Sequence, residues 1–362
     1  MKTTRMLSRS ALLALVTTGI AATQIYAQTY VGSDECKRCH EDLWNEHRVS
    51  GHAHSLLTSL DAEPTALPLP EGYSFNDVSY IIGGYRWKAR YLDPNGYFIT
   101  TVDGGTPGRN QFNLESNEWV DYHAGEVNVR FECGQCHTTG YSFSGHQGGL
   151  PGIQGTWEFD GVQCERCHGP ASDHVFNPSR FNITVNPGVC RVCHVTGNEA
   201  AVPASGGFIE HQAQYNEILA SPHFFLDCTV CHEPHKQAKF SFQVECTLCH
   251  DEQADTSTAF KNLGRRHLAR DVGCVDCHMP YAVKSAASFG PFQGDLRSHL
   301  FGVTLDEDDT MFNAAGDLAN GELTAAYVCL GCHENIVNKF TAQGRPEKAE
   351  KWARKKARKI HK

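Results

Sequence analysis

Cys36-Lys37-Arg38-Cys39-His40 is the first of eight units in which a histidine directly follows the second cysteine of a Cys-x-x-Cys pair. Together these units use all sixteen cysteines of the 362-residue chain. The spacing is typical of c-type haem attachment, because each thiol can bond one vinyl group of the same porphyrin. The adjacent histidine is then placed as the proximal ligand of the iron. The sequence therefore predicts eight covalently bound haem c groups.

The predicted cofactor-binding residues follow from the eight units. The cysteines that would hold the porphyrins are Cys36, Cys39, Cys133, Cys136, Cys164, Cys167, Cys190, Cys193, Cys228, Cys231, Cys246, Cys249, Cys274, Cys277, Cys329 and Cys332. The proximal histidines would be His40, His137, His168, His194, His232, His250, His278 and His333.

Paired cysteines have three other common uses: zinc sites, redox-active dithiols and disulfide frameworks. None of them requires a histidine directly after the second cysteine. Histidine accounts for only 20 of the 362 residues, so eight such coincidences are not expected by chance. The pattern favours haem over these alternatives.

The first 27 residues have the pattern of a secretion signal. Lys2, Arg5 and Arg9 precede an apolar run over residues 11–22, and Ala27 could serve as the cleavage point. The run is too short to span a bilayer. We expect residues 1–27 to be a signal peptide, with a retained N-terminal anchor as the alternative. The mature protein would be periplasmic, extracellular or on the cell surface, with no integral membrane span.

Charge is unevenly distributed along the mature sequence. Residues 345–362 contain nine basic and two acidic residues, a net charge of +7, whereas residues 28–344 carry −19. Overall charge therefore argues against nucleic-acid binding, and the separation of charge could steer a redox partner protein. We expect residues 28–344 to form one octahaem domain.

The basic tail has the pattern of an amphipathic helix over residues 345–362. Ala349, Trp352, Ala353, Ala357 and Ile360 fall on one stripe. The helix could dock onto another surface, or it could be a solvated terminal helix.

The fold class follows from how few residues serve each haem, about 42 in the mature chain. Apolar side chains would then pack against porphyrins as much as against each other. We expect a mainly α and irregular fold, with short helices around a stack of eight haems and little sheet. A β-hairpin near residues 85–101 is the exception, because alternating aromatic and basic residues precede the turn Asp93-Pro94-Asn95-Gly96. The glycine pair Gly83-Gly84 predicts a tight turn near a haem.

The sixth ligand of each iron separates an electron carrier from an enzyme. Only Met279 and Met311 remain after signal removal, whereas twelve histidines lie outside the motifs. Eight of these histidines would complete bis-histidine ligation, which predicts low-spin irons of low potential.

Several stretches resemble the multihaem cytochromes related to the tetrahaem electron carrier of ammonia oxidation, a family that also has octahaem members. They span most of residues 30–301 and are Ser50-Gly51-His52, Ile82-Gly83-Gly84-Tyr85-Arg86-Trp87-Lys88-Ala89-Arg90, Cys133-Gly134-Gln135-Cys136-His137-Thr138-Thr139-Gly140-Tyr141, Pro151-Gly152-Ile153, Gly155-Thr156-Trp157, Cys167-His168-Gly169-Pro170, Cys231-His232-Glu233-Pro234-His235 and Cys277-His278-Met279-Pro280.

This resemblance ranks the histidines outside the motifs as distal ligands. The eight that it favours are His174, His223, His235, His267, His299, His52, His211 and His123. His47, His54 and His146 are the substitutes, and His361 is not expected to bind a haem of its own chain.

Three functions from different classes follow. The leading hypothesis is an electron carrier between redox partner proteins. The second is a reductase of a small nitrogen or sulfur oxyanion such as nitrite, hydroxylamine or tetrathionate, with one open haem site. Arg86, Lys88 and Arg90 could bind the anion, but the surplus of histidines and the lack of a Cys-x-x-Cys-Lys motif count against an open site. The third is a homo-oligomer, the subunit of an extracellular cytochrome filament.

Overall fold

The computed structural model describes residues 28–251, 267 and 270–360. The predicted signal peptide of residues 1–27 and His361 lie outside the described residues. No helix within the described ranges is both long and apolar enough to cross a membrane.

Each Cys-x-x-Cys-His motif overlaps one short turn of helix. The turns are α1 (Ser33–Lys37), α4 (Gly134–His137), α5 (Cys164–His168), the 3₁₀ helix η4 (Pro187–Val192), α8 (Cys228–Cys231), the 3₁₀ helix η5 (Cys246–Leu248), α12 (Cys274–His278) and α13 (Ala325–Cys329). Further short helices connect them, namely α2 (Glu41–His47), α3 (Ser59–Ala62), η1 (Glu63–Thr65), η2 (Phe75–Asp77), η3 (Gln147–Gly149), α6 (Ser172–Phe176), α7 (Gln214–Ala220) and α9 (Ala238–Ser241). The expectation of short helices that carry the motifs is confirmed.

The N-terminal part contains more sheet than expected. A five-stranded antiparallel sheet has the order β1 (Leu56–Thr58), β2 (Tyr80–Gly83), β3 (Lys88–Leu92), β6 (Gln111–Asn113) and β7 (Glu118–Val120). Successive side chains of β2 pack into different apolar clusters, because side chains alternate between the two faces of a strand. Ile81 packs in one apolar cluster with Tyr91, and Ile82 packs in another with Phe131.

The hairpin expected near residues 85–101 forms in reduced size. Its turn is present, since the Gly96 amide donates to the Asp93 carbonyl. The returning segment pairs with β3 only at the bridge Leu92–Phe98, and β3 instead lies between β2 and β6. The strand β3 therefore pairs mainly with β2 and β6, which come before and after the expected hairpin in the sequence.

The turn between β2 and β3 requires glycine. Gly83 and Gly84 have φ angles of 75° and 83°, in the left-handed region. A Cβ on Gly83 would lie 2.5 Å from the Lys88 carbonyl oxygen, and one on Gly84 would lie 2.4 Å from a methyl of Leu67. The glycine pair thus brings the backbone of this turn close to its neighbours.

The C-terminal part is built on a second sheet. Its order is β12 (Val283–Lys284), β11 (Phe208–Glu210), β10 (Val202–Ser205) and β14 (Leu318–Ala319), and only the β12–β11 pair is parallel. Two-stranded pairs add β4 (Thr101–Val102) with β5 (Thr106–Pro107), β8 (Thr138–Thr139) with β9 (Phe159–Asp160), and β13 (Val303–Thr304) with β15 (Leu323–Thr324). The fold is therefore mixed α and β, which corrects the expectation of a mainly helical chain with little sheet.

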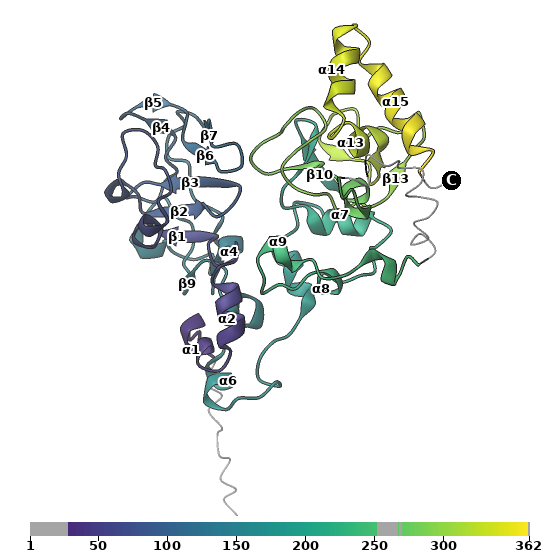
Figure 1. Ribbon diagram of the computed structural model, residues 1–362. Coiled ribbons are helices and arrows are strands. Elements are labelled where there is room, and N and C mark those ends of the chain that lie inside the picture. The colour runs from purple at the N-terminus through teal and green to yellow at the C-terminus, as the bar shows by residue number, and fades with distance from the viewer. Residues whose placement is uncertain (1–27, 252–266, 268–269, 361–362) are drawn as a thin grey trace, which may run out of the picture.

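The chain ends in a helical hairpin of α14 (Glu334–Ala342) and α15 (Glu347–Ala357), which projects at the top of the molecule (Figure 1). Ala349 and Ala353 are buried against α13, and Trp352 packs beside them. The apolar stripe predicted for the tail therefore lies against the body of the protein.

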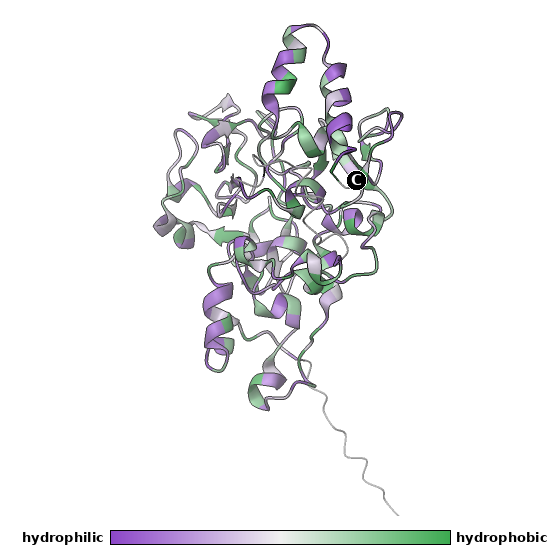
Figure 2. Ribbon diagram, turned by 45° about the vertical axis from the view of Figure 1, so that its right-hand side comes forward, coloured by the Kyte–Doolittle hydropathy of each residue, from purple (hydrophilic) through white to green (hydrophobic). Residues whose placement is uncertain are grey.

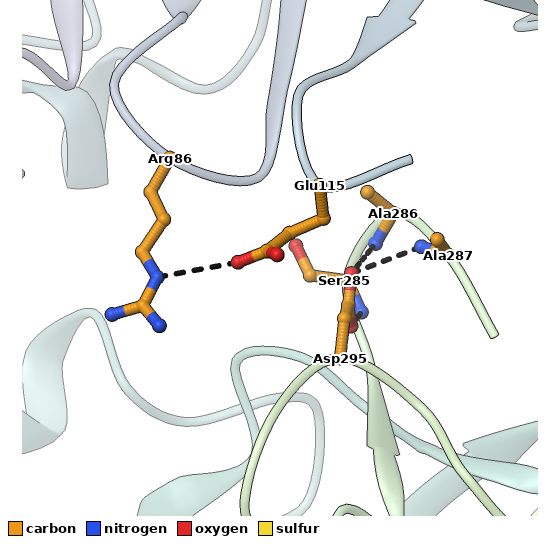
Figure 3. A network of polar contacts seen from close by, with 6 residues as sticks. All are labelled: Arg86, Glu115, Ser285, Ala286, Ala287 and Asp295. Carbon is orange, nitrogen blue, oxygen red and sulfur yellow. Dashed lines mark hydrogen bonds and ion pairs between the residues drawn. The ribbon is translucent and has the colours of Figure 1, made fainter. Parts of the chain in front are cut away.

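A loop of the C-terminal part contacts the N-terminal sheet. The carboxylate of Asp295 accepts hydrogen bonds from the backbone amides of Ser285, Ala286 and Ala287, at 2.6, 2.7 and 2.9 Å (Figure 3). The Lys88 ammonium donates to the Ser285 carbonyl at 2.7 Å, and the Asn113 amide donates to the Ala286 carbonyl at 3.1 Å. The buried Asp295 thus shapes the loop that joins the two parts.

We expect Asp295→Asn to lower the free energy of unfolding by about 1–3 kcal/mol, because the new amide nitrogen cannot accept the backbone hydrogen bonds. Denaturant unfolding of the haem-loaded protein, followed by circular dichroism, measures the change. Asp308→Asn is the matched control, because Asp308 is exposed; we expect its effect to stay within about 0.5 kcal/mol. Equal stability of the two variants would contradict the assigned role of Asp295.

Candidate haem sites

The local geometry of each motif follows from one turn of helix. The histidine amide donates to the carbonyl of the first cysteine, for example from His40 to Cys36 at 2.9 Å and from His137 to Cys133 at 3.1 Å. Residues three and four apart lie on the same side of such a turn. Both thiols and the imidazole of a motif are therefore presented to one side.

A single large cavity of about 3150 Å³ connects most of the motifs. Fourteen of the sixteen cysteines line it, and Cys329 and Cys332 complete the sixteen. Free cysteine is usually among the most buried residue types. Here all sixteen are free of disulfides and none is buried. Large apolar side chains are also exposed on its walls, namely Leu43, Val175, Val185, Phe225, Val230 and Phe242. Such walls fit large apolar groups bound to the thiols.

Histidines from distant parts of the chain face one another in pairs, and five of the six pairs described next line this cavity. Six pairs combine a motif histidine with one outside the motifs: His40 with His174 at 6.3 Å between ring centres, His194 with His52 at 6.2 Å, His168 with His235 at 6.2 Å, His250 with His223 at 5.7 Å, His232 with His299 at 6.1 Å and His333 with His267 at 5.6 Å. Six of the eight predicted distal histidines are in this set.

The spacing of these pairs suits one metal ion between two imidazoles. An imidazole nitrogen lies about 2 Å from a bound metal and about 1 Å from its own ring centre, so facing rings have centres about 6 Å apart. In the pair of His267 and His333, the two Nε2 atoms face each other at 3.4 Å. The residues present therefore fit haem irons that are ligated from both sides.

Hydrogen bonds fix the tautomer of several of these imidazoles. The Nδ1 atoms of His137, His168 and His278 donate to the backbone carbonyls of Ser55, Thr184 and Phe301, at 2.8, 2.7 and 2.9 Å. A carbonyl only accepts, so Nδ1 carries the proton and Nε2 keeps the lone pair that a metal requires.

Similar hydrogen bonds at Nδ1 orient the rings of two candidate distal ligands. His174 Nδ1 lies 3.0 Å from the Ser179 carbonyl, and His235 Nδ1 lies 2.6 Å from a carboxylate oxygen of Glu233. A carboxylate behind a ligating histidine orients the ring and raises its basicity. Sequence reasoning missed the role of Glu233, although its position two residues before His235 was a usable signal.

Burial keeps the imidazoles of His52 and His299 neutral. Desolvation lowers the pKa of His52 and of His299 to about 4. The neutral form is the one that binds a metal.

Glu217 of α7 is fully buried, and desolvation raises its pKa to about 7. Its carboxyl group accepts from the backbone amide of His299 at 2.7 Å and positions that segment. Glu217 belongs to no recognisable sequence motif, so its role could not be predicted from the sequence.

Electrostatic interactions between cysteines of different motifs give the order of the sites. The Cys36 and Cys164 thiols are close enough to interact, and this interaction raises the pKa of Cys36 and lowers that of Cys164 to about 6. Equivalent interactions link Cys136 with Cys193 and Cys190 with Cys228. Further electrostatic interactions link Cys167 with Cys193, Cys231 with Cys246, Cys246 with Cys274, and Cys277 with Cys329 and Cys332. When the motifs are numbered 1 to 8 along the chain, these interactions link them in the order 1–3–4–5–6–7–8, and motif 2 is linked to motif 4.

The surroundings of His137 differ from those of the six pairs. No second imidazole within the described ranges faces it at a comparable ring distance. Lys88, Arg90 and His211 are close enough to interact with it electrostatically. Burial lowers the pKa of Lys88 to about 7 and that of His211 to about 3. A buried basic cluster therefore lies beside His137, where each of the six pairs has a facing histidine.

The remaining candidates make local contacts. His123 of the predicted set forms an exposed ion pair with Glu126, and His211 does not reach pairing distance of a motif histidine among the described residues. Of the substitutes, His47 directs Nε2 to the Val162 carbonyl at 2.9 Å, and His54 stacks on Tyr85. His146 lies 2.6 Å from the Ile153 carbonyl through Nδ1.

The sequence matches the family of cytochrome c554 and c-prime over residues 109–169, which include the motifs of His137 and His168. No curated protein matches the chain. The fold is similar to that of the outer cell wall cytochrome OcwA, with a TM-score of 0.55, 19% identity and 87% of each chain covered. It is also similar to the octaheme sulfite reductase MccA of Wolinella succinogenes, with a TM-score of 0.60 and 16% identity. That likeness covers 84% of this chain but only 65% of the reductase. The chain is therefore similar to multihaem c-type cytochromes in sequence over residues 109–169 and in fold over most of its length.

Proposed function

We propose that the chain is an exported electron carrier that holds eight haem c groups, one on each Cys-x-x-Cys-His motif. The observation that carries the proposal is the set of six facing histidine pairs, five of which lie along one cavity walled by cysteines. The haems would supply the redox chemistry, and the protein would set their ligands, order and surroundings.

The electrostatic interactions between thiols support a continuous route. A thiol bound to a porphyrin lies at its edge, so interacting thiols such as Cys36 and Cys164 bring two porphyrin edges together. The motif order 1–3–4–5–6–7–8 then gives a row with one end at His40 and the other at His333. The site of His137 would form a branch at motif 4.

The ligand pairs support low potentials. Histidine on both sides of the iron lacks the methionine that raises the potential of many c-type cytochromes. His235, supported by Glu233, is the clearest distal ligand to test, because its ring is parallel to that of His168 within 3°.

We expect His235→Met to raise the midpoint potential of one haem by on the order of 0.1 V, within the ~0.8 V range that axial ligands control. A spectroelectrochemical titration of the purified protein measures it, and the other haems should keep their potentials.

The matched control is His146→Met, because His146 is exposed and does not face a motif histidine among the described residues. We expect its titration curve to superimpose on that of the wild type. Identical curves for His235→Met and the wild type would remove His235 from the ligands.

A second function is favoured by the surroundings of His137. Its haem could keep an open position that takes a small nitrogen or sulfur oxyanion, with sulfite among the candidates because one similar structure is a sulfite reductase. Lys88 and Arg90 would bind the anion. Arg90 is held against the Tyr122 ring at 3.5 Å and against Gln111 at 2.6 Å, so its guanidinium is fixed in place.

An open site predicts a high-spin ferric signal in electron paramagnetic resonance from about one haem in eight. Added nitrite should convert that signal to a low-spin one. We expect Lys88→Met to weaken nitrite binding at least tenfold, because a hydrogen bond to a charged group contributes about 1.5–3 kcal/mol.

Lys239→Met is the control, since Lys239 is exposed on α9, and its nitrite affinity should equal that of the wild type. Low-spin signals that account for all the haems would eliminate the reductase and leave the carrier.

A further inference from the structure

The outer face of α15 carries a stripe of lysines. Lys348, Lys351 and Lys355 are exposed and recur at intervals of three and four residues, so they lie on one side of the helix. Ala349 and Ala353 on the other side are buried against α13. Figure 2 shows that hydrophilic residues dominate this projecting hairpin. We call Lys348, Lys351 and Lys355 the lysine stripe.

Within the part of the chain that the structure describes, none of the three ammonium groups of the lysine stripe takes part in an ion pair, although Glu347 and Glu350 lie in the first turn of the same helix. The nearby acidic loop of residues 306–309 pairs instead with Arg358. The guanidinium of Arg358 lies 3.8 Å from the Glu307 carboxylate and donates to the Leu305 carbonyl at 3.0 Å. The stripe is therefore a positive area on a molecule whose net charge is −9.

The lysine stripe lies beside the last motif of the row. The ring of Trp352 is 5.1 Å from the His333 ring, and the Lys356 ammonium is 5.8 Å from the centre of the Trp352 ring. Cys332 of the same motif is exposed. One face of α15 thus packs against the motif of His333, while the opposite face presents the lysines to solvent.

We propose that the lysine stripe is the docking surface for an acidic redox protein, which exchanges electrons at the end of the row marked by His333. The inference rests on the proposed electron-carrier function. A one-signed surface area attracts an oppositely charged partner, raises the rate of encounter and orients the complex. In the forward direction the reduced partner would lose one electron, which the haem held by His333 would accept.

The test measures binding before electron transfer. The probe is an oxidised plant-type [2Fe–2S] ferredoxin, used as an acidic redox protein, with the haem-loaded cytochrome also oxidised. We expect Lys351→Gln/Lys355→Gln to raise the Kd by roughly three- to tenfold at low ionic strength, because each exposed ion pair contributes up to about 1 kcal/mol. The difference should shrink at high salt, where the Debye length falls to about 3 Å.

Lys239→Gln/Lys284→Gln is the matched control, since both lysines are exposed and the variant loses the same net charge on α9 and β12 instead of on α15. Its Kd should stay within twofold of the wild type. Equal weakening in both double variants would overturn the docking site, because overall charge would explain it. Loss of binding to phosphatidylglycerol vesicles without a change in the ferredoxin Kd would also overturn it in favour of a membrane.

The two proposals fail in different ways. If the wild type is reduced and reoxidised reversibly in a redox titration but does not bind ferredoxin, the docking surface is wrong and the carrier stands. If the wild type cannot be cycled at all, the proposed function itself fails.

Discussion

The proposed ligation of each iron by two imidazoles is the interaction on which the rest of this fold would depend. It places histidines from remote segments about 6 Å apart, as in the pair of His267 and His333, which are 66 positions apart in the sequence. The apolar clusters of the fold are small and separate, and large apolar side chains line the cavity between them. Much of the burial that normally stabilises a domain would therefore come from contact with porphyrin. Because bound metal groups add their binding free energy to folding, assembly and folding are expected to be coupled.

The local part of the haem sites could be predicted from the sequence, and the long-range part only by analogy. Cysteine, cysteine and histidine at positions i, i+3 and i+4 define one helical turn wherever they occur, so the eight motifs need no tertiary information. The partner of each motif histidine depends on how the loops pack. His235 and His299 were ranked by resemblance and do face motif histidines, whereas His123 forms a surface ion pair with Glu126. The sheets escaped prediction because their strands are short. The strand β10 spans four residues and includes Pro203, and β12 spans two.

The electron carrier and the reductase differ in one local feature of the same structure. A histidine opposite a motif histidine caps the iron and leaves only electron transfer, whereas basic side chains in that place leave room for an anion. Lys88 is anchored to the Ser285 carbonyl, so its position depends on the loop that Asp295 shapes. The contact between the two parts of the fold therefore also sets the charge beside His137. A carrier would use this site as a side branch, because the row from His40 to His333 does not pass through it.

In α15, packing and charge act together at the His333 end of the proposed row of haems. If α15 were only a solvated tail, its alanines would not need to be buried, and Trp352 would not need to contact the ring of His333. Burial of one face fixes the direction of the other, so the lysines are held in a defined orientation instead of moving with a flexible chain. A fixed positive area next to a motif, on an otherwise anionic protein, favours approach of an acidic partner at that end and disfavours it elsewhere. The same anionic body would repel that partner from the site of His40. The two ends of the row are thus chemically distinct, which gives a reason for electrons to enter and leave at different ends.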